Sequence, residues 1–163
     1  MDEQRTLIGI DGASNKTGVA VARNGKIIFY NLIDCHRTKD REDRITEMTK
    51  SIVDVLEKFS PDVIYMEDTW VSQNPKASQI LTTILGGVRY WSTEHNCIFR
   101  TILPSSWRKQ LGMNEHGAKR NELKQRSIDY VKDKFGIDVT DDISDAICIT
   151  IVGYNKEFRG NED

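Results

Sequence analysis

The hydrophobic period of this chain changes at residue 41, and that change limits the folds it can adopt. Before it, apolar side chains gather in three short runs typical of β-strands, at residues 5–11, 17–23 and 26–33. Asn24 and Gly25 separate the last two runs, and because both tolerate positive φ they predict a tight hairpin. Over residues 41–59 apolar residues recur every three or four positions, which predicts an amphipathic helix.

The rest of the chain alternates between the two periods. Strands are predicted at 62–67 and 97–102, and helices at 76–94, 104–111, 118–134 and 141–154. A strand, a helix and a second strand in succession imply a right-handed crossover and parallel pairing, so we expect 62–67 beside 5–11. The predicted fold is α/β: a mixed five-stranded sheet, three antiparallel strands followed by parallel ones, with helices on both faces. This topology resembles ribonuclease H-like folds.

Length and composition indicate a single domain. The 163 residues are enough for one core, and we expect residues 1–163 to form one unit with a polar, frayed tail at about 155–163. No apolar run is long enough to span a membrane, and the start does not resemble a signal peptide. Three scattered cysteines predict reduced thiols and no zinc site. We therefore expect a cytoplasmic protein.

Charge is distributed unevenly along the chain, although the net charge is only −2. Residues 100–134 contain nine Lys or Arg and four acids, whereas residues 138–163 contain seven acids and two bases. A basic segment followed by an acidic one suits a phosphate-binding surface beside a metal site. Solvated charged helices would give the same pattern.

Four acidic residues are expected to converge. Asp11 and Glu67 each end a predicted buried strand, and Asp142 and Asp145 are three apart at the start of a predicted helix. Singly, each could be a loop cap or a first-turn acid. Together, carboxylates in a dry cleft repel one another and need a cation, and oxygen ligands favour Mg²⁺ or Mn²⁺. That chemistry is typical of phosphodiester cleavage.

Four motifs, in order along residues 6–153, resemble those of RuvC-type Holliday junction resolvases of the ribonuclease H-like superfamily. They are Ile8-Gly9-Ile10-Asp11-Gly12-Ala13-Ser14 with Thr17-Gly18, Glu67-Asp68-Thr69-Trp70 with Asn74, Pro104-Ser105-Ser106-Trp107-Arg108-Lys109-Gln110 with Ala118-Lys119, and Asp142 with Asp145-Ala146. Gly12-Ala13 stands where family members usually carry Pro-Gly. This departure suggests a divergent branch, such as a phage-encoded one.

The resemblance implies a nuclease that resolves Holliday junctions, and other branched DNA, by paired symmetric nicks. It implies two Mg²⁺ ions per site, with Mn²⁺ able to substitute, held by Asp11, Glu67, Asp142 and Asp145. Lys119 would contact the scissile phosphate. The expected DNA contacts are Trp70, Asn74, Arg108, Lys109, Lys119 and Arg120. Whether Arg108 or Lys109 takes the basic role, whether Trp70 stacks on a base, and whether Trp107 is core or DNA platform stay open.

A four-way junction is nearly two-fold symmetric, so a homodimer would supply two matched sites. The broad apolar face of the predicted helix 76–94 is either this interface or a face packed on the sheet, and Gly86-Gly87 would allow close approach of another backbone. The alternatives are a ribonuclease H or flap-type nuclease of the same fold, and a non-catalytic protein that binds DNA structures. The sequence does not identify a helicase partner.

Overall fold

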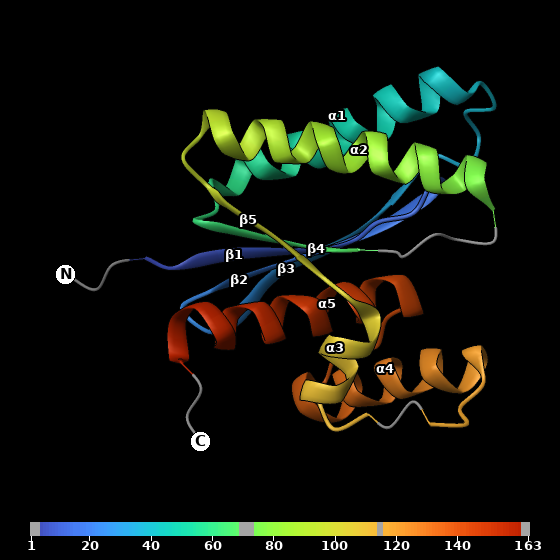
Figure 1. The fold of residues 1–163 in the computed structure, drawn as a ribbon. Coiled ribbons are helices and arrows are strands. Elements are labelled where there is room, and N and C mark those ends of the chain that lie inside the picture. Colours follow the sequence, from blue (N-terminus) through green and yellow to red (C-terminus); the bar gives the residue numbers. More distant parts are fainter. Residues whose placement is uncertain (1–3, 69–73, 114–115, 161–163) are drawn as a thin grey trace.

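The computed structural model describes residues 4–68, 74–113 and 116–160. Its centre is a five-stranded sheet in the order β3-β2-β1-β4-β5 (Figure 1). The strands are β1 (Thr6–Asp11), β2 (Lys16–Arg23), β3 (Lys26–Asp34), β4 (Val63–Glu67) and β5 (Ile98–Ile102). The hairpin between β2 and β3 has φ of 51° at Asn24 and 78° at Gly25, as the Asn-Gly pair predicts.

Strand pairing confirms the predicted mixed sheet. β1 pairs with β2 and β2 with β3 in antiparallel fashion, whereas β1 pairs with β4 and β4 with β5 in parallel. Ile10 lies opposite Met66 in the parallel pair, so the next residues, Asp11 and Glu67, end neighbouring strands at the same edge. β1 and β4 are the central strands, and their buried apolar side chains place this edge deep in the molecule.

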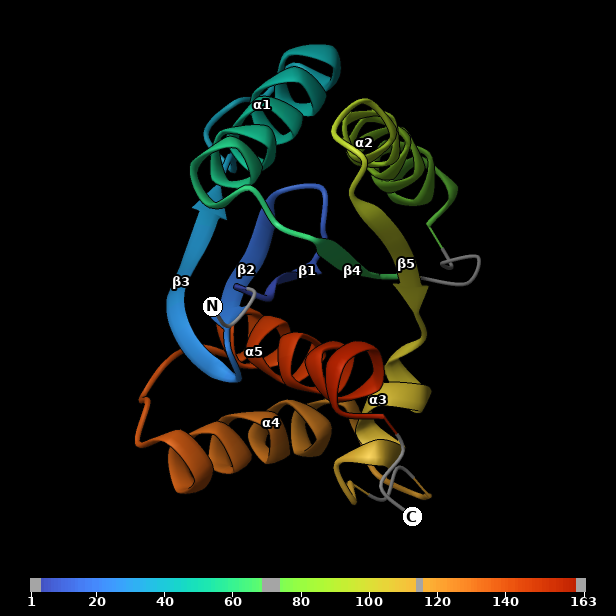
Figure 2. The same cartoon turned by 90° about the vertical axis from the view of Figure 1, so that its left-hand side faces the viewer.

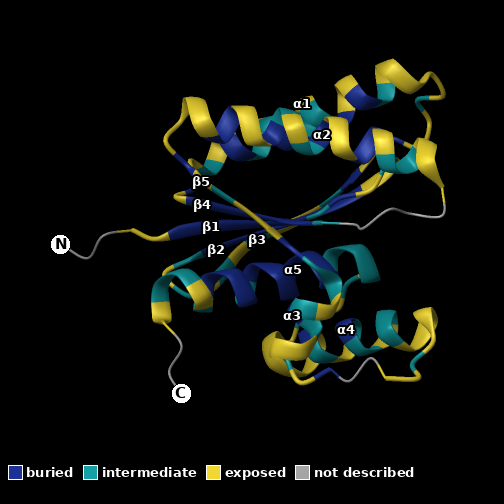
Figure 3. Cartoon of the chain, in the orientation of Figure 1, coloured by how far each residue is buried: buried dark blue, intermediate teal, exposed yellow. Residues whose placement is uncertain are grey.

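Helices cover both faces of the sheet (Figure 2). α1 (Arg41–Phe59) and α2 (Pro75–Glu94) lie on one face; α5 (Asp141–Tyr154), with α3 (Pro104–Gln110) and α4 (Arg120–Phe135), lies on the other. Each side has its own hydrophobic core. α5 is the most buried helix because it lies between the sheet and α4, as the burial colours show (Figure 3). The predicted α/β fold with helices on both faces is confirmed.

The apolar face of α2 packs within the chain. Ile80, Ile84 and Val88 are buried in the core shared with α1 and the sheet. A Cβ at Gly87 would lie 2.9 Å from Thr49 Cγ2, so this glycine permits close packing of α2 against α1. Of the two roles predicted for the apolar face, packing within the chain is therefore the one observed. A subunit interface on α2 would have to use its other face, which exposes Tyr90.

The expectation of a frayed tail is wrong for residues 155–159. This segment forms a π-helical turn, η1 (Asn155–Arg159), directly after α5. Glu157 Oε1 accepts hydrogen bonds from the Tyr65 hydroxyl at 2.8 Å and from Arg100 Nε at 3.0 Å. Residues 155–159 are fixed because their one acid, Glu157, finds partners on β4 and β5, a long-range contact that local polarity does not reveal.

Two further expectations concern the cysteines and the membrane. Cys35, Cys97 and Cys148 are buried free thiols, as predicted. None of the helices in the described part of the chain is long and apolar enough to cross a membrane.

Candidate active site

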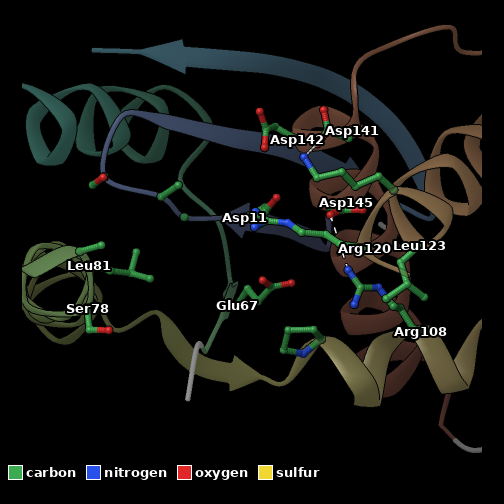
Figure 4. A pocket seen from close by; sticks show the side chains of 16 residues that line it. Asp11, Glu67, Ser78, Leu81, Arg108, Arg120, Leu123, Asp141, Asp142 and Asp145 are labelled. Atoms are coloured by element: carbon green, nitrogen blue, oxygen red, sulfur yellow. Dashed lines mark ion pairs between the residues drawn. The ribbon is translucent and has the colours of Figure 1, made fainter. Parts of the chain in front are cut away.

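The four predicted carboxylates line one cleft, together with Asp141. Asp11 and Glu67 come from the ends of β1 and β4, and Asp142 and Asp145 come from the first turns of α5 (Figure 4). Because α5 begins at the same edge of the sheet where β1 and β4 end, residues far apart in sequence meet there. The cleft has a volume of about 640 Å³. The predicted convergence of the four acids is therefore observed, and their role as metal ligands stays a prediction.

Two glycines allow α5 to lie this close to the sheet. A Cβ at Gly18 on β2 would overlap the backbone carbonyl of Asp142, and one at Gly9 on β1 would overlap the Thr150 side chain. Thr150 Oγ1 in turn donates to the Ala20 carbonyl at 3.3 Å and to the Ala146 carbonyl at 2.7 Å. The absence of side chains at these two strand positions therefore sets the distance between Asp142 and the sheet.

Burial and mutual repulsion raise the pKa values of the three aspartates Asp11, Asp142 and Asp145. The pKa of Asp11 is raised well above its usual value by burial and by the charges of Glu67, Asp145 and Asp142, with Arg108 opposing. Burial raises the pKa of Asp145 to about 6, although Ser127 and Arg108 act to lower it. The pKa of Asp142 is raised by burial and by Asp141. The site thus holds ionised carboxylates only at a free-energy cost, which a bound cation would offset.

The donor set fits a hard divalent cation. Asp145 Oδ1 is buried and has no hydrogen-bond partner among the described residues, so it is an acceptor that a cation could satisfy. Among the described residues that line the cleft, the side chains able to bind a metal are mainly those of Asp and Glu, and none is His or Cys. Within residues 4–68, 74–113 and 116–160, no three acidic, Cys or His side chains stand close enough to form a ready-made site.

α3 brings two consecutive side chains to the acids. Trp107 is fully buried, and its Nε1 donates a hydrogen bond to Glu67 Oε2 at 2.9 Å. Arg108 lines the cleft, with its Nη2 4.0 Å from Asp145 Oδ2 and its guanidinium 4.7 Å from the centroid of the Trp107 ring. Of the two open alternatives for Trp107, core residue is the one observed. Its bond to Glu67 was not predicted; the only sequence signal is that a buried indole needs an acceptor.

Three basic side chains line the same cleft as the acids: Arg108, Arg120 and Lys124. Lys124, from α4, forms an ion pair with Asp141, the residue just before Asp142. Sequence reasoning missed Lys124 and Asp141, because their pairing depends on how α4 crosses α5. Between Arg108 and Lys109, the structure places Arg108 in the cleft, whereas Lys109 is exposed and is not among the lining residues.

Lys119 and Asn74, two other predicted DNA contacts, are not among the residues that line the cleft. Lys119 is exposed and immediately precedes α4, where its backbone N–H donates to Glu122 Oε2 at 3.0 Å. Asn74 precedes α2, and its side-chain oxygen accepts from the backbone N–H groups of Lys76 and Ala77. Its observed role is thus to cap the helix. Trp70 lies outside the described residues.

Comparison with known proteins agrees with this geometry. Residues 7–153 match the family model of the crossover junction endodeoxyribonuclease RuvC. The RuvC of Synechocystis is 29% identical over 132 residues, covering 79% of this chain and 75% of the relative. The RuvC of Pelodictyon phaeoclathratiforme is 22% identical over 162 residues, covering 93% of this chain and 82% of the relative.

Two solved structures share the fold. Thermus thermophilus RuvC in complex with a Holliday junction substrate superposes with a TM-score of 0.72 at 15% identity, covering 94% of this chain and 96% of that one. The yeast mitochondrial Holliday junction resolvase Ydc2 gives a TM-score of 0.60 at 16% identity, covering 89% of this chain and 75% of that one.

Proposed function

The chain belongs to the RuvC family of crossover junction endodeoxyribonucleases, and from this premise we propose that its acidic cleft resolves Holliday junctions. The protein is an endonuclease that hydrolyses phosphodiester bonds of junction DNA. One observation supports this reaction at this place: carboxylates from β1, β4 and α5 line one cleft with three basic side chains (Figure 4). Such a cleft can hold both a divalent cation and the phosphate that the cation polarises.

RuvC-family nucleases depend on metal. For this chain we propose Mg²⁺, with Mn²⁺ able to substitute, and two ions held by Asp11, Glu67, Asp142 and Asp145. Bound ions would supply an activated water and stabilise the attacking and leaving oxygens of the phosphodiester. Asp11 lies between Glu67 and the two acids of α5, so its carboxylate is best placed to be shared by two ions.

The basic side chains bind and orient the DNA backbone. Arg108 and Arg120 can donate to phosphate oxygens from the cleft wall, and a guanidinium matches a phosphate with two parallel hydrogen bonds. Lys119, beside Arg120, is our proposed contact to the scissile phosphate. Lys109 extends the basic surface outside the cleft. Because these contacts neutralise phosphates, we expect junction affinity to fall steeply with salt.

Resolution into two duplexes needs two nicks placed symmetrically on a nearly two-fold substrate. We propose that the protein acts as a homodimer, so that two identical clefts face the two scissile strands. The exposed face of α2 is the candidate interface. It carries Tyr90, which is 67% exposed.

A cleavage assay tests the proposed function. Purified protein with Mg²⁺ or Mn²⁺ would be given a labelled four-way junction, a replication fork, a flap, a linear duplex and an RNA–DNA hybrid. We expect metal-dependent, symmetric nicks in the junction. Asp11→Asn should abolish cleavage and keep junction affinity, because the acids serve the chemistry and the basic residues serve binding.

Other patterns of cleavage would indicate other functions. Equal cutting of forks and junctions would broaden the substrate class to branched DNA, and cutting of the hybrid alone would indicate a ribonuclease H. Binding without cutting would leave a DNA-structure-binding protein. Full activity of Asp11→Asn would contradict the assignment of the acidic cleft as the active site.

A further inference from the structure

We propose that Trp107 is a positioning residue for Glu67, whose hydrogen bond holds that carboxylate in its metal-binding orientation. The inference rests on the proposed function and adds to it a residue that touches neither DNA nor metal. Trp107 comes from α3, whereas Glu67 ends β4, so the bond joins two elements that meet at the cleft.

The geometry of the bond is specific. The Trp107 side chain is fully buried in the core between α5 and the sheet, so its ring cannot turn without disturbing that core. Its Nε1 lies 2.9 Å from Glu67 Oε2, and the bond itself is buried. Glu67 is also buried, with 9% of its surface exposed. A rigid donor therefore fixes the position of one carboxylate oxygen at the edge of the cleft.

The chemistry of the indole N–H also favours a role in orienting Glu67. An indole N–H can only donate, so the bond forms only with an oxygen that accepts. A hydrogen bond to a carboxylate in a buried site is stronger than one between neutral groups. Groups that orient metal ligands in this way commonly change metal affinity by about 10- to 100-fold when they are removed. Trp107 therefore has the placement and the chemistry to orient Glu67.

Trp107 also supports a second part of the site. The Arg108 guanidinium lies over its ring at 4.7 Å from the centroid, and Arg108 Nη2 is 4.0 Å from Asp145 Oδ2. Through two consecutive residues, α3 thus reaches a carboxylate on β4 and another on α5. The indole ring is the common support of both contacts.

The chain contains a matched control. Trp91 is also buried, and its Nε1 donates to Glu57 Oε1 at 2.7 Å. That bond joins α2 to α1, and neither residue lines the cleft. Trp91→Phe and Trp107→Phe therefore each remove an indole N–H that donates to a glutamate. They differ in that Glu67 is buried and lines the cleft, whereas Glu57 is 57% exposed and lies outside it.

Metal affinity is the first readout. Mn²⁺ binding would be measured by calorimetry on the wild type, Trp107→Phe and Trp91→Phe, without DNA. We expect Trp107→Phe to weaken Mn²⁺ binding by about 10- to 100-fold and Trp91→Phe to leave it unchanged. Junction affinity in EDTA should stay within about twofold for both, because neither tryptophan lies among the basic residues that bind phosphate. Unchanged Mn²⁺ affinity in Trp107→Phe would overturn the proposal.

A double-mutant cycle separates positioning from general loss of packing. In a Glu67→Gln background, Trp107→Phe should cause no further loss of Mn²⁺ affinity, because the carboxylate that it orients is gone. An equal loss in both backgrounds would show that the effect does not pass through Glu67, and would overturn the proposal.

A third measurement needs no folded Trp107 variant. In ¹H–¹⁵N spectra of the wild type, the Trp107 indole resonance is identified by elimination with Trp91→Phe and Trp70→Phe. We expect it to move on titration with Mg²⁺, and this response to disappear in Glu67→Gln. A Trp107 indole resonance whose position does not change on addition of Mg²⁺ would overturn the proposal. A wild type that neither cuts junctions nor binds Mn²⁺ would instead overturn the proposed function, and this inference with it.

Discussion

Asp145 shows how the acidic site lowers the stability of the metal-free protein. Its carboxyl is buried, one of its oxygens has no hydrogen-bond partner among the described residues, and burial raises its pKa to about 6. A carboxyl whose pKa is higher in the folded than in the unfolded state makes a contribution to stability that is fully present below the unfolded pKa. That contribution is lost as the pH rises through the folded pKa, here about 6. At neutral pH the ionised group therefore destabilises the metal-free protein.

We predict that Asp145→Asn stabilises the metal-free protein at pH 8 by roughly 1–3 kcal/mol and has little effect at pH 4, where the wild-type carboxyl is already neutral. Urea unfolding in EDTA at pH 4, 6 and 8 would measure this difference. The variant should not cut junctions, so stability and activity would change in opposite directions. A destabilised variant at pH 8 would show that the contact with Arg108 outweighs the cost of burial.

At the scale of single residues, the sequence predicted the four acids but not the side chains that contact them. Asp11 and Glu67 were predictable because each ends an apolar run, and the order of strands and helices brings those ends together. The bond between Trp107 and Glu67 and the ion pair between Lys124 and Asp141 were not predictable. Both depend on the angle at which a helix meets another element, and no local pattern encodes that angle.

At the scale of elements, the approach of α5 to the sheet decides where Asp142 lies. Gly18 is a strand residue with no room for a side chain, because the first turn of α5 lies directly over it. The backbone carbonyl of Asp142 is the atom that a Cβ would strike, so any larger residue must push α5 away from β2. A buried helix moved in this way loses packing along its whole length.

We predict that Gly18→Ala lowers the free energy of unfolding by about 2–4 kcal/mol, the range of overpacked and strained core sites, and lowers cleavage more than junction binding. Thermal unfolding and single-turnover cleavage would measure the two effects. Gly86→Ala is the control: Gly86 lies inside α2 with open space around it, so alanine there should stabilise the helix by about 0.5–1 kcal/mol. Equal behaviour of the two variants would contradict the packing argument.

Glu157, in the π-helical turn η1, is the basis of a separate prediction. Burial would raise the pKa of Glu157, but hydrogen bonds from Arg100 and Tyr65 outweigh it and lower the pKa. A lowered pKa gives stability that is present above the unfolded pKa and lost as the pH falls through the folded one. Glu157→Gln should therefore destabilise the protein by about 1 kcal/mol at pH 7 and by less near pH 3. Denaturant unfolding at both pH values is the check, and an effect that grows in acid would refute it.

On the scale of the whole molecule, the proposed dimer would have to bring two clefts to one junction. The apolar face of α2 is buried in its own core, so a dimer that used α2 would have to meet the opposite face, where Tyr90 is 67% exposed. The width of the apolar face could not decide between a subunit interface and packing within the chain, because either use buries the same side chains. The strand order of the sheet was predictable because the Asn-Gly hairpin and the right-handed crossover leave few other ways to pair the strands.

We predict a dimer at micromolar concentration by sedimentation, and at least a tenfold weaker dimer in Tyr90→Glu, because a charge would have to be buried at the interface. Tyr30→Glu is the matched control, since Tyr30 is 41% exposed on the edge strand β3. A wild type that sediments as a monomer would remove the paired-nick argument. A dimer unaffected by Tyr90→Glu would place the interface elsewhere.

The position of α5 along the chain has a consequence for how the enzyme is made. Every strand of the sheet, and two of the four acids, precede α5 in sequence. Asp142 and Asp145 reach the cleft only when α5 has docked, and docking covers the second face of the sheet at the same time. The folding step that completes the core therefore also brings the four proposed catalytic acids together, and a fragment that lacks α5 has neither the covered second face nor the full set of acids.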